Sequence, residues 1–260
     1  MTPYIRTMLL GVTLVAALAL SAQNDCRHQL QLTPFTADGD AIDSPEFYCE
    51  DRKSGVYYAV SYNDKYLYIS LDIAGLVLQN QIVLTGLTTW IETDEGKKGV
   101  LYPMGLPASG RPKDTYTLDY YIGAIRQNLP ERLAGADRLA LINFYGKHDT
   151  VIGSTRNPGG INAGIQLDTV NLMHLELALP RSAFPGMCSG PLTLRFETGG
   201  LGRPTDLRGS DAVGQNPGVL QDMTLLTRAS RERQVRIDRY LDYASPTEWK
   251  LTGIRCGAEP

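Results

Sequence analysis

The sequence has 260 residues, of which 43% are hydrophobic, with 25 basic and 28 acidic side chains. The net charge of −3 is mild, and no block of one sign is long enough to follow a phosphate backbone, which excludes nucleic acid as an expected partner. The length suits one large sandwich or two small domains. Because no Pro- or Ser-rich linker divides the chain, we expect a single domain over residues 23–260.

Residues 1–22 have the three-part plan of a secretory signal peptide. Arg6 is the only charge before an apolar run at residues 8–20, and the small residues Ser21 and Ala22 follow it. As a helix this run spans roughly 20 Å, less than the ~30 Å hydrocarbon core of a membrane. We therefore expect cleavage near Ala22, export to the periplasm or the extracellular space, and no transmembrane anchor afterwards. The alternative is a buried N-terminal helix.

Four cysteines remain after that cleavage, and an even number in an oxidising compartment favours two disulfides. Sequence positions leave three pairings open, and four buried thiols are the alternative. No two cysteines have the spacing of a zinc site, and the histidines are scattered, so no metal is expected. The cysteines are Cys26, Cys49, Cys188 and Cys256.

The first expected strands form a hairpin at residues 56–63 and 65–73. Both runs are rich in Tyr, Val and Ile, and polar residues lie between them. Because side chains alternate across a strand, the Leu and Ile residues of the second run should face the core and its Tyr, Ser and Asp residues should face away. The two faces hold Leu67, Ile69, Leu71 and Ile73 on one side, and Tyr66, Tyr68, Ser70 and Asp72 on the other.

A short helical turn and a second hairpin come next. Apolar residues at helical spacing over 76–84 stop before Gly86, which predicts a short helix or a loop. Residues 87–93 alternate again, and the polar turn at 94–99 leads into a strand at 100–102, so these residues predict the second hairpin.

Further strands and one more short helix follow towards the C-terminus. The helix is expected between Tyr121 and Asp137, with Pro130 as an interruption. About ten short strands and few helices predict an all-β fold, a sandwich of two antiparallel sheets with one or two short helices. The remaining strands are expected at residues 115–121, 139–145, 163–167, 172–179, 192–198 and 248–254.

Residues 199–246 show no clear strand pattern and carry five arginines between positions 228 and 239. Structureless loops of more than about 15 residues are uncommon in compact domains and are either functional or disordered. We expect a long, mobile loop here, and the alternative is a lid or a basic binding loop.

Five phrases of the sequence, at residues 60–69, 81–91, 96–103, 175–180 and 248–251, occur in the same order in a known group of proteins. They resemble uncharacterised secreted proteins of Gram-negative bacteria, which are β-sandwiches similar to family 9 carbohydrate-binding modules and to DOMON domains. The resemblance implies two packed antiparallel sheets, of jelly-roll or DOMON-like and carbohydrate-binding-module-like form, and a binding role.

The candidate ligand site combines aromatic rings with hydrogen-bonding side chains. A sugar stacks its C–H face on a flat ring while nearby polar groups hold its hydroxyls. If the strands at 65–73 and 87–93 lie in one sheet with these faces aligned, one binding surface results. The alternative is that the same aromatics pack under a loop or in the second layer of the sandwich. The candidate residues are Tyr66, Tyr68, Asp72, Trp90 and Glu92.

A second polar pattern involves His174 and Glu176, which share a face of their predicted strand, as do Arg195 and Glu197 on a candidate neighbouring strand. A histidine beside two carboxylates serves acid–base chemistry or binds a metal. Charge pairs across a solvated sheet face explain the same pattern. Met173 points to the opposite face from His174, so the two cannot hold a haem together, and no cofactor is expected.

These features predict an exported, non-catalytic binding module for carbohydrate or another extracellular ligand. The alternative is a structural or interaction protein of the cell envelope, which binds another envelope protein and has no small-molecule site. A hydrolase is a third interpretation, although several carboxyl pairs in the sequence meet its spacing and none is specific. Exposure of Tyr66, Tyr68 and Trp90 on one face would favour the first interpretation, and their burial the second.

Overall fold

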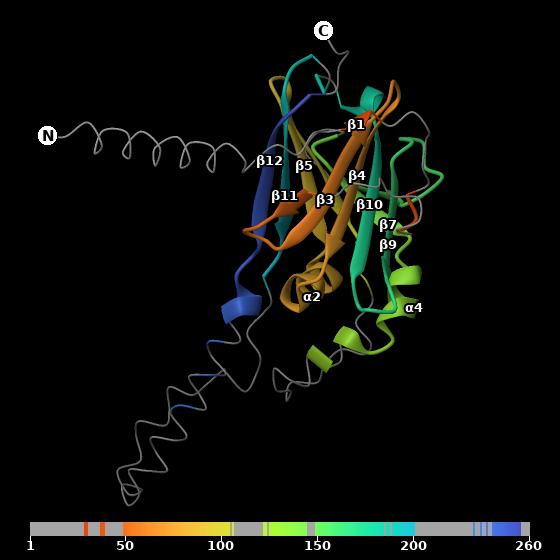
Figure 1. The fold of residues 1–260 in the computed structure, drawn as a ribbon. Helices are drawn as coiled ribbons and strands as arrows, with labels where there is room; N and C mark the ends of the chain where they lie inside the picture. Colours follow the sequence, from red (N-terminus) through yellow and green to blue (C-terminus); the bar gives the residue numbers. More distant parts are fainter. Residues whose placement is uncertain are drawn as a thin grey trace, which may run out of the picture.

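The computed structural model shows two β-sheets that pack against each other (Figure 1). Each sheet contains six strands among the described residues. The structure describes residues 29–30, 37–39, 49–104, 106, 122–123, 125–144, 149–184, 186–187, 189–200, 231, 235, 238 and 241–255.

Sheet A, as we name the first sheet, has the strand order β1-β3-β4-β10-β9, and β2 also pairs with β3. All of these pairs are antiparallel except β1 with β3. The long strands β4 and β10 pair from Ile73 opposite Met173 to Tyr66 opposite Pro180. The strands are β1 (Gln29–Leu30), β2 (Cys49–Asp51), β3 (Val56–Tyr62), β4 (Tyr66–Ile73), β9 (Asn162–Leu167) and β10 (Met173–Pro180).

Sheet B is fully antiparallel and has the order β12-β11-β5-β6-β7-β8. A two-residue turn joins β5 to β6 and places Trp90 opposite Gly99 and Glu92 opposite Lys97. The strands are β5 (Leu87–Thr93), β6 (Gly96–Tyr102), β7 (Arg138–Ile142), β8 (Thr150–Gly153), β11 (Leu192–Thr198) and β12 (Glu248–Ile254).

The core lies between the sheets and is built by the inward side chains of both. On β4 the four alternating Leu and Ile side chains from Leu67 to Ile73 are fully buried, as their spacing predicts. On β11 the ring of Phe196 is equally buried and stacks on Trp249 of β12, with the ring centroids 4.9 Å apart. Each such side chain stabilises the fold by about 1.5–3 kcal/mol through the apolar surface it removes from water.

Helix α2 (Leu76–Thr85) carries the chain from β4 in sheet A to β5 in sheet B. It ends at Gly86, whose φ of 76° lies in the left-handed region. A Cβ at this position would lie 2.6 Å from the carbonyl oxygen of Pro103, so only glycine fits. In Figure 1 the helix lies at one end of the sandwich. Because of this crossover, strands that are close in sequence belong to different sheets.

The buried side chain of Gln81 on α2 joins β11 to the segment before β12. Its amide nitrogen donates to the carbonyl oxygens of Tyr243 and Ser245, at 3.2 and 2.7 Å. Its Oε1 accepts hydrogen bonds from the hydroxyls of Thr198 and Thr247, at 3.0 and 2.8 Å. The backbone N–H of Thr198 also donates to the carbonyl oxygen of Thr247, so the chain leaves and re-enters sheet B at one point.

The structure confirms the all-β sandwich with short helices, and some element boundaries differ. Pro130 lies in the first turn of α4 (Leu129–Ala134), where its missing N–H breaks no helical hydrogen bond, so it begins the helix and does not interrupt it. The strand expected at 139–145 ends at Ile142. The sequence did not predict β8, because its four residues are too few to show a clear alternation. A short 3₁₀ turn, η2 (Arg181–Ala183), follows β10.

Several predictions fall outside the described residues. These are the signal peptide at 1–22, the strand at 115–121 and most of the loop at 199–246. The cysteine pairing also stays a prediction, because Cys49 in β2 is described while Cys26, Cys188 and Cys256 are not. In the described ranges no helix is long and apolar enough to cross a membrane.

Candidate functional site

The outer face of sheet B holds a tryptophan that lies close against the sheet. Trp90 on β5 is opposite Gly99 on β6, and a Cβ at Gly99 would lie 2.7 and 2.8 Å from two carbon atoms of the indole. Because glycine has no side chain, the ring packs directly on the backbone of β6. Trp90 is only partly buried, so part of the indole faces the solvent.

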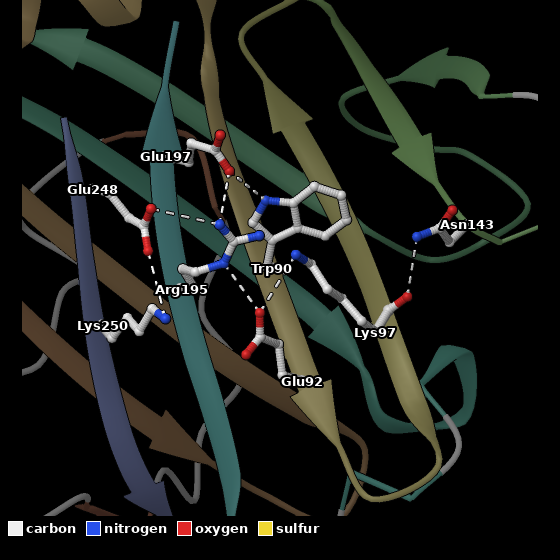
Figure 2. A network of polar contacts seen from close by, with 8 residues as sticks. All are labelled: Trp90, Glu92, Lys97, Asn143, Arg195, Glu197, Glu248 and Lys250. Carbon is white, nitrogen blue, oxygen red and sulfur yellow. Dashed lines mark hydrogen bonds and ion pairs between the residues drawn. The ribbon is translucent and has the colours of Figure 1, made fainter. Parts of the chain in front are cut away.

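Arg195 on β11 links carboxylates from three strands beside this ring (Figure 2). Its Nε donates to Oε1 of Glu92 at 3.0 Å, and its Nη1 donates to Oε2 of Glu197 at 3.0 Å. The same Nη1 lies 3.7 Å from Oε2 of Glu248. The Cζ atom of Arg195 is 5.4 Å from the centroid of the Trp90 ring. The guanidinium is thus held by charge-assisted hydrogen bonds at the edge of the indole.

Lys97 on β6 lies over the indole, with Nζ 3.9 Å from the ring centroid and 3.5 Å from Oε1 of Glu92 (Figure 2). The indole Nε1 of Trp90 donates to Oε2 of Glu197 at 3.1 Å, which fixes the ring in its plane. We use the name Trp90 platform for the set Trp90, Glu92, Lys97, Arg195 and Glu197.

The Trp90 platform has one flat ring, with the Lys97 ammonium over it and the Arg195 guanidinium and two carboxylates beside it. The guanidinium and the ammonium only donate, and the two carboxylates only accept. Such a combination suits a ligand that has apolar C–H faces and many hydroxyls at its rim.

Of the two aromatics of the predicted site on β4, Tyr68 is covered and Tyr66 is partly buried. Tyr68 is 2% exposed and lies in a small apolar cluster with Ala37 and Ala178. Tyr66 stacks on it, with ring centroids 5.8 Å apart. The side-chain amide of Asn63 donates to the Tyr68 hydroxyl at 3.0 Å, and burial raises the pKa of that phenol. Tyr68 is therefore a packed side chain and not an accessible ring.

A second polar cluster centres on His174 of β10, which is 6% exposed. Its Nδ1 lies 2.7 Å from Oδ1 of Asp72, and its Nε2 lies 3.6 Å from Oδ2 of Asp168. The hydrogen bond to Asp72 raises the pKa of His174 more than burial lowers it. Burial raises the pKa of Asp168, but the backbone N–H groups of Leu172 and Val170 and the charge of His174 together lower it. Since both carboxylates accept hydrogen bonds, the protonated imidazolium satisfies both contacts.

Glu176 shares the outer face of sheet A with His174, as predicted, but it is not solvated. It is 1% exposed, and the backbone N–H of Gly39 donates to its Oε2 at 3.2 Å. A Cβ at Gly164 would lie 2.1 Å from the carbonyl carbon of Asp38. Residues 37–39 therefore lie directly on this face.

The structure does not bring the five predicted site residues onto one surface. Tyr66, Tyr68 and Asp72 belong to sheet A, while Trp90 and Glu92 belong to sheet B. Both sets alternate with core residues, so they point to opposite sides of the sandwich. The reason is the crossover at α2, which separates two strands that are neighbours in sequence.

Sequence reasoning also missed residues of the platform and misplaced others. Lys97 and Gly99 could have been found from the two-residue turn, because such a turn fixes which residues of β5 and β6 are opposite. Arg195 and Glu197 lie in sheet B, so the expectation that their strand neighbours that of His174 is wrong. Among the described residues, no group of three or more His, Cys, Asp or Glu side chains is arranged to hold a metal ion.

Comparisons with known proteins give a weak structural similarity. No protein-family model matches the sequence, and no curated protein matches it. A family 9 carbohydrate-binding module from Caldicellulosiruptor kristjanssonii in complex with cellotriose aligns with 66% of this chain and 74% of its own, at 8% identity and a TM-score of 0.29. The module from the same organism in complex with glucose aligns with 66% and 76%, at 9% identity and a TM-score of 0.28. A TM-score this low carries no argument about a shared ligand.

Proposed function

We propose that the protein is an exported, non-catalytic module that binds a glycan on the Trp90 platform. The observation that carries the proposal is the indole of Trp90, which packs on Gly99, with the Arg195 guanidinium nearby and the Lys97 ammonium over the ring. A pyranose ring presents C–H groups on its faces and hydroxyls at its rim, and it therefore complements a flat ring surrounded by donors and acceptors.

A sugar reaches the indole only after Lys97 moves aside. The ion pair of Lys97 with Glu92 is solvent-exposed on both sides, at 37% and 32%, and such pairs contribute about 0.2–1 kcal/mol. The cation–π contact with Trp90 adds about 0.5–1 kcal/mol at an exposed site. Displacing the ammonium therefore costs at most about 2 kcal/mol. Lys97 then remains beside the ligand and can donate to its hydroxyls.

The export part of the proposal is supported by the plan of residues 1–22, and it includes two disulfides among the four cysteines. Intact mass of the protein recovered from the periplasm or the medium tests both. We expect a chain that begins near Gln23 and that gains the mass of one hydrogen per cysteine on reduction. A chain that keeps Met1, or one whose mass does not change on reduction, contradicts this part.

The second candidate function is a structural or interaction protein of the cell envelope without a small-molecule site. The burial of Tyr68 favours it, because that ring is unavailable to a ligand. In this interpretation the Trp90 platform stabilises the outer face of sheet B through cross-strand pairs.

A glycan array probed with the mature protein and three variants separates the two candidates. We expect Trp90→Ala to abolish binding and Trp90→Phe to retain part of it, because a smaller ring still stacks. Tyr57→Ala is the matched control: Tyr57 is an aromatic that is 43% exposed on sheet A, and its loss should leave binding unchanged. Binding that survives Trp90→Ala would place the ligand elsewhere, and a wild-type protein that binds no glycan would favour the envelope interaction protein.

A further inference from the structure

A pocket of about 260 Å³ lies at the turn end of the β5–β6 hairpin. Ile91 and Phe184 give it an apolar lining, and Lys98, Asn143 and Glu95 contribute polar groups. Its volume is slightly below the range of about 300–1,000 Å³ that is typical of drug-sized ligand pockets, so it suits a ligand with a single ring.

This pocket shares Lys97 with the Trp90 platform but is otherwise lined by different residues. Lys98 is opposite Ile91 in the hairpin, so its side chain is on the inward face of sheet B. Lys97 is opposite Glu92 and is on the outward face, where the platform lies. The side chains of the two neighbouring lysines therefore start from different faces of the sheet, and Lys98 is the one that belongs to the pocket alone.

Lys98 differs from the other cations of this region because it has no acidic partner in the described part of the chain. Its Nζ donates to the carbonyl oxygen of Ala183 at 3.0 Å and lies 4.8 Å from the centroid of the Phe144 ring. By contrast, Lys97 pairs with Glu92, and Arg195 pairs with three carboxylates. A partly buried ammonium without a counter-charge favours the binding of an anion.

We propose that this pocket binds a carboxylate attached to a six-membered ring. An ammonium has three N–H groups, and the carbonyl oxygen of Ala183 takes one of them, so two remain for the carboxylate of a ligand. The side-chain amide of Asn143, which donates to the carbonyl oxygen of Lys97 at 3.3 Å, supplies a further polar group at the rim. Ile91 and Phe184, each 2% exposed, give the ring a small apolar contact.

Glu95 is the acidic residue that lines the pocket, and it opposes an anion. It is exposed in the turn, so water screens its charge, whereas Lys98 is partly buried and its charge is screened less. The attraction by Lys98 therefore outweighs the repulsion by Glu95. Removing the Glu95 charge should strengthen binding of the ligand.

Two sources could supply this chemistry, a free aromatic acid or a uronic acid residue of a glycan, and the test separates them. The mature protein, labelled with ¹⁵N, is titrated with benzoate and with glucuronate and followed by NMR. Benzyl alcohol and glucose are the neutral controls, and acetate is the control for a carboxylate without a ring. We expect at least one acid to give saturable shifts at the amides of Ile91, Thr93 and Lys98, and the neutral compounds to give none.

Substitutions of Lys98 and Glu95 test whether the ammonium of Lys98 binds the carboxylate of the ligand. Lys98→Met keeps the length of the side chain and should weaken binding about tenfold or more, the usual effect of losing a charge-assisted hydrogen bond. Lys98→Arg should retain most of the affinity, and Glu95→Gln should increase it. Lys53→Met, at an exposed lysine in the turn between β2 and β3, is the matched control and should change nothing.

The proposal is overturned if neither acid produces saturable shifts at millimolar concentration, if the shifts lie away from the hairpin, or if acetate or the neutral compounds bind as well as the acids. The proposal is also overturned if the Lys98→Met variant binds the acids with the affinity of the wild type. Should Lys98→Met not fold, the shift map of the wild type and a loss of affinity with added salt still decide the question.

Discussion

The two sheets share one core but differ on their outer faces. On sheet A the outward side chains of Tyr68, Ser70 and Glu176 are all less than 3% exposed, and residues 37–39 lie across them. On sheet B the outward carboxylates of Glu92, Glu197 and Glu248 reach water and pair with Lys97 or Arg195. The alternation of residues along a strand therefore tells which side chains face the shared core, but not whether another segment covers the other side.

The largest expected difference between the faces comes from removing one aromatic ring from each. Tyr68→Ala should lower the free energy of unfolding by about 3–5 kcal/mol, because it leaves a cavity between sheet A and the residues that cover it. Trp90→Ala should cost about 1–2 kcal/mol, because solvent fills the space of a partly exposed ring. Urea unfolding of both variants measures the difference. Equal costs would mean that the two faces are covered alike.

A matched pair of glycines tests what lies on each face. Gly164→Ala places a methyl group 2.1 Å from the backbone of Asp38, which cannot rotate away, and should cost about 1–3 kcal/mol. Gly99→Ala places it 2.7 Å from the Trp90 ring, which can turn, and should cost less while shifting Trp90 fluorescence. Urea unfolding and emission spectra check both. If Gly164→Ala were as mild as Gly99→Ala, residues 37–39 would not be held against sheet A.

The histidine on the covered face of sheet A predicts that the stability depends on pH near neutrality. The pKa of His174 is raised above the ordinary value of 6.5, so its stabilisation is complete below pH 6.5 and is lost as the pH rises through the raised value. Unfolding free energies measured on both sides of pH 6.5 should fall with increasing pH. His174→Gln should flatten that part of the curve, and a variant with the wild-type slope would assign the effect to another group.

The smallest expected effect is on the exposed face. Lys97→Ala should change the free energy of unfolding by about 1 kcal/mol, and by about 2 kcal/mol at most, because its contacts with Glu92 and Trp90 are exposed to water. It should also make Trp90 more accessible to acrylamide, since the ammonium no longer lies over the ring. Trp249 is buried, so the quenching reports on Trp90. Unchanged quenching would show that Lys97 does not cover the indole in solution.

Local patterns in the sequence predict much of the fold. The alternation in residues 65–73, the helical spacing before Gly86 and the strands at 192–198 and 248–254 all agree with the structure. These features depend on contacts between residues that are near in sequence or on the burial of one face, and both leave a periodic trace.

The candidate site could be predicted only in part. Trp90 and Glu92 lie together on an outward face, as expected, and the two-residue turn contains enough information to add Lys97 and Gly99. Pairing between distant strands leaves no local trace, so the position of Arg195 beside Glu92 and the separation of β4 from β5 could not be read from spacing. The packing of Ala37 on Tyr68 is likewise a contact between residues that are far apart in sequence.

The hydrogen bonds that Gln81 makes with Thr198 and Thr247 have a consequence for the evolution of this chain. They hold the end of β11 beside the segment before β12, so the two ends of the interval between those threonines lie next to each other. The entropy of closing a loop changes by only about 0.6 kcal/mol for each doubling of its length. A change in the number of residues between Thr198 and Thr247 should thus cost little in loop-closure entropy, which makes this interval a route to new properties by insertion or deletion.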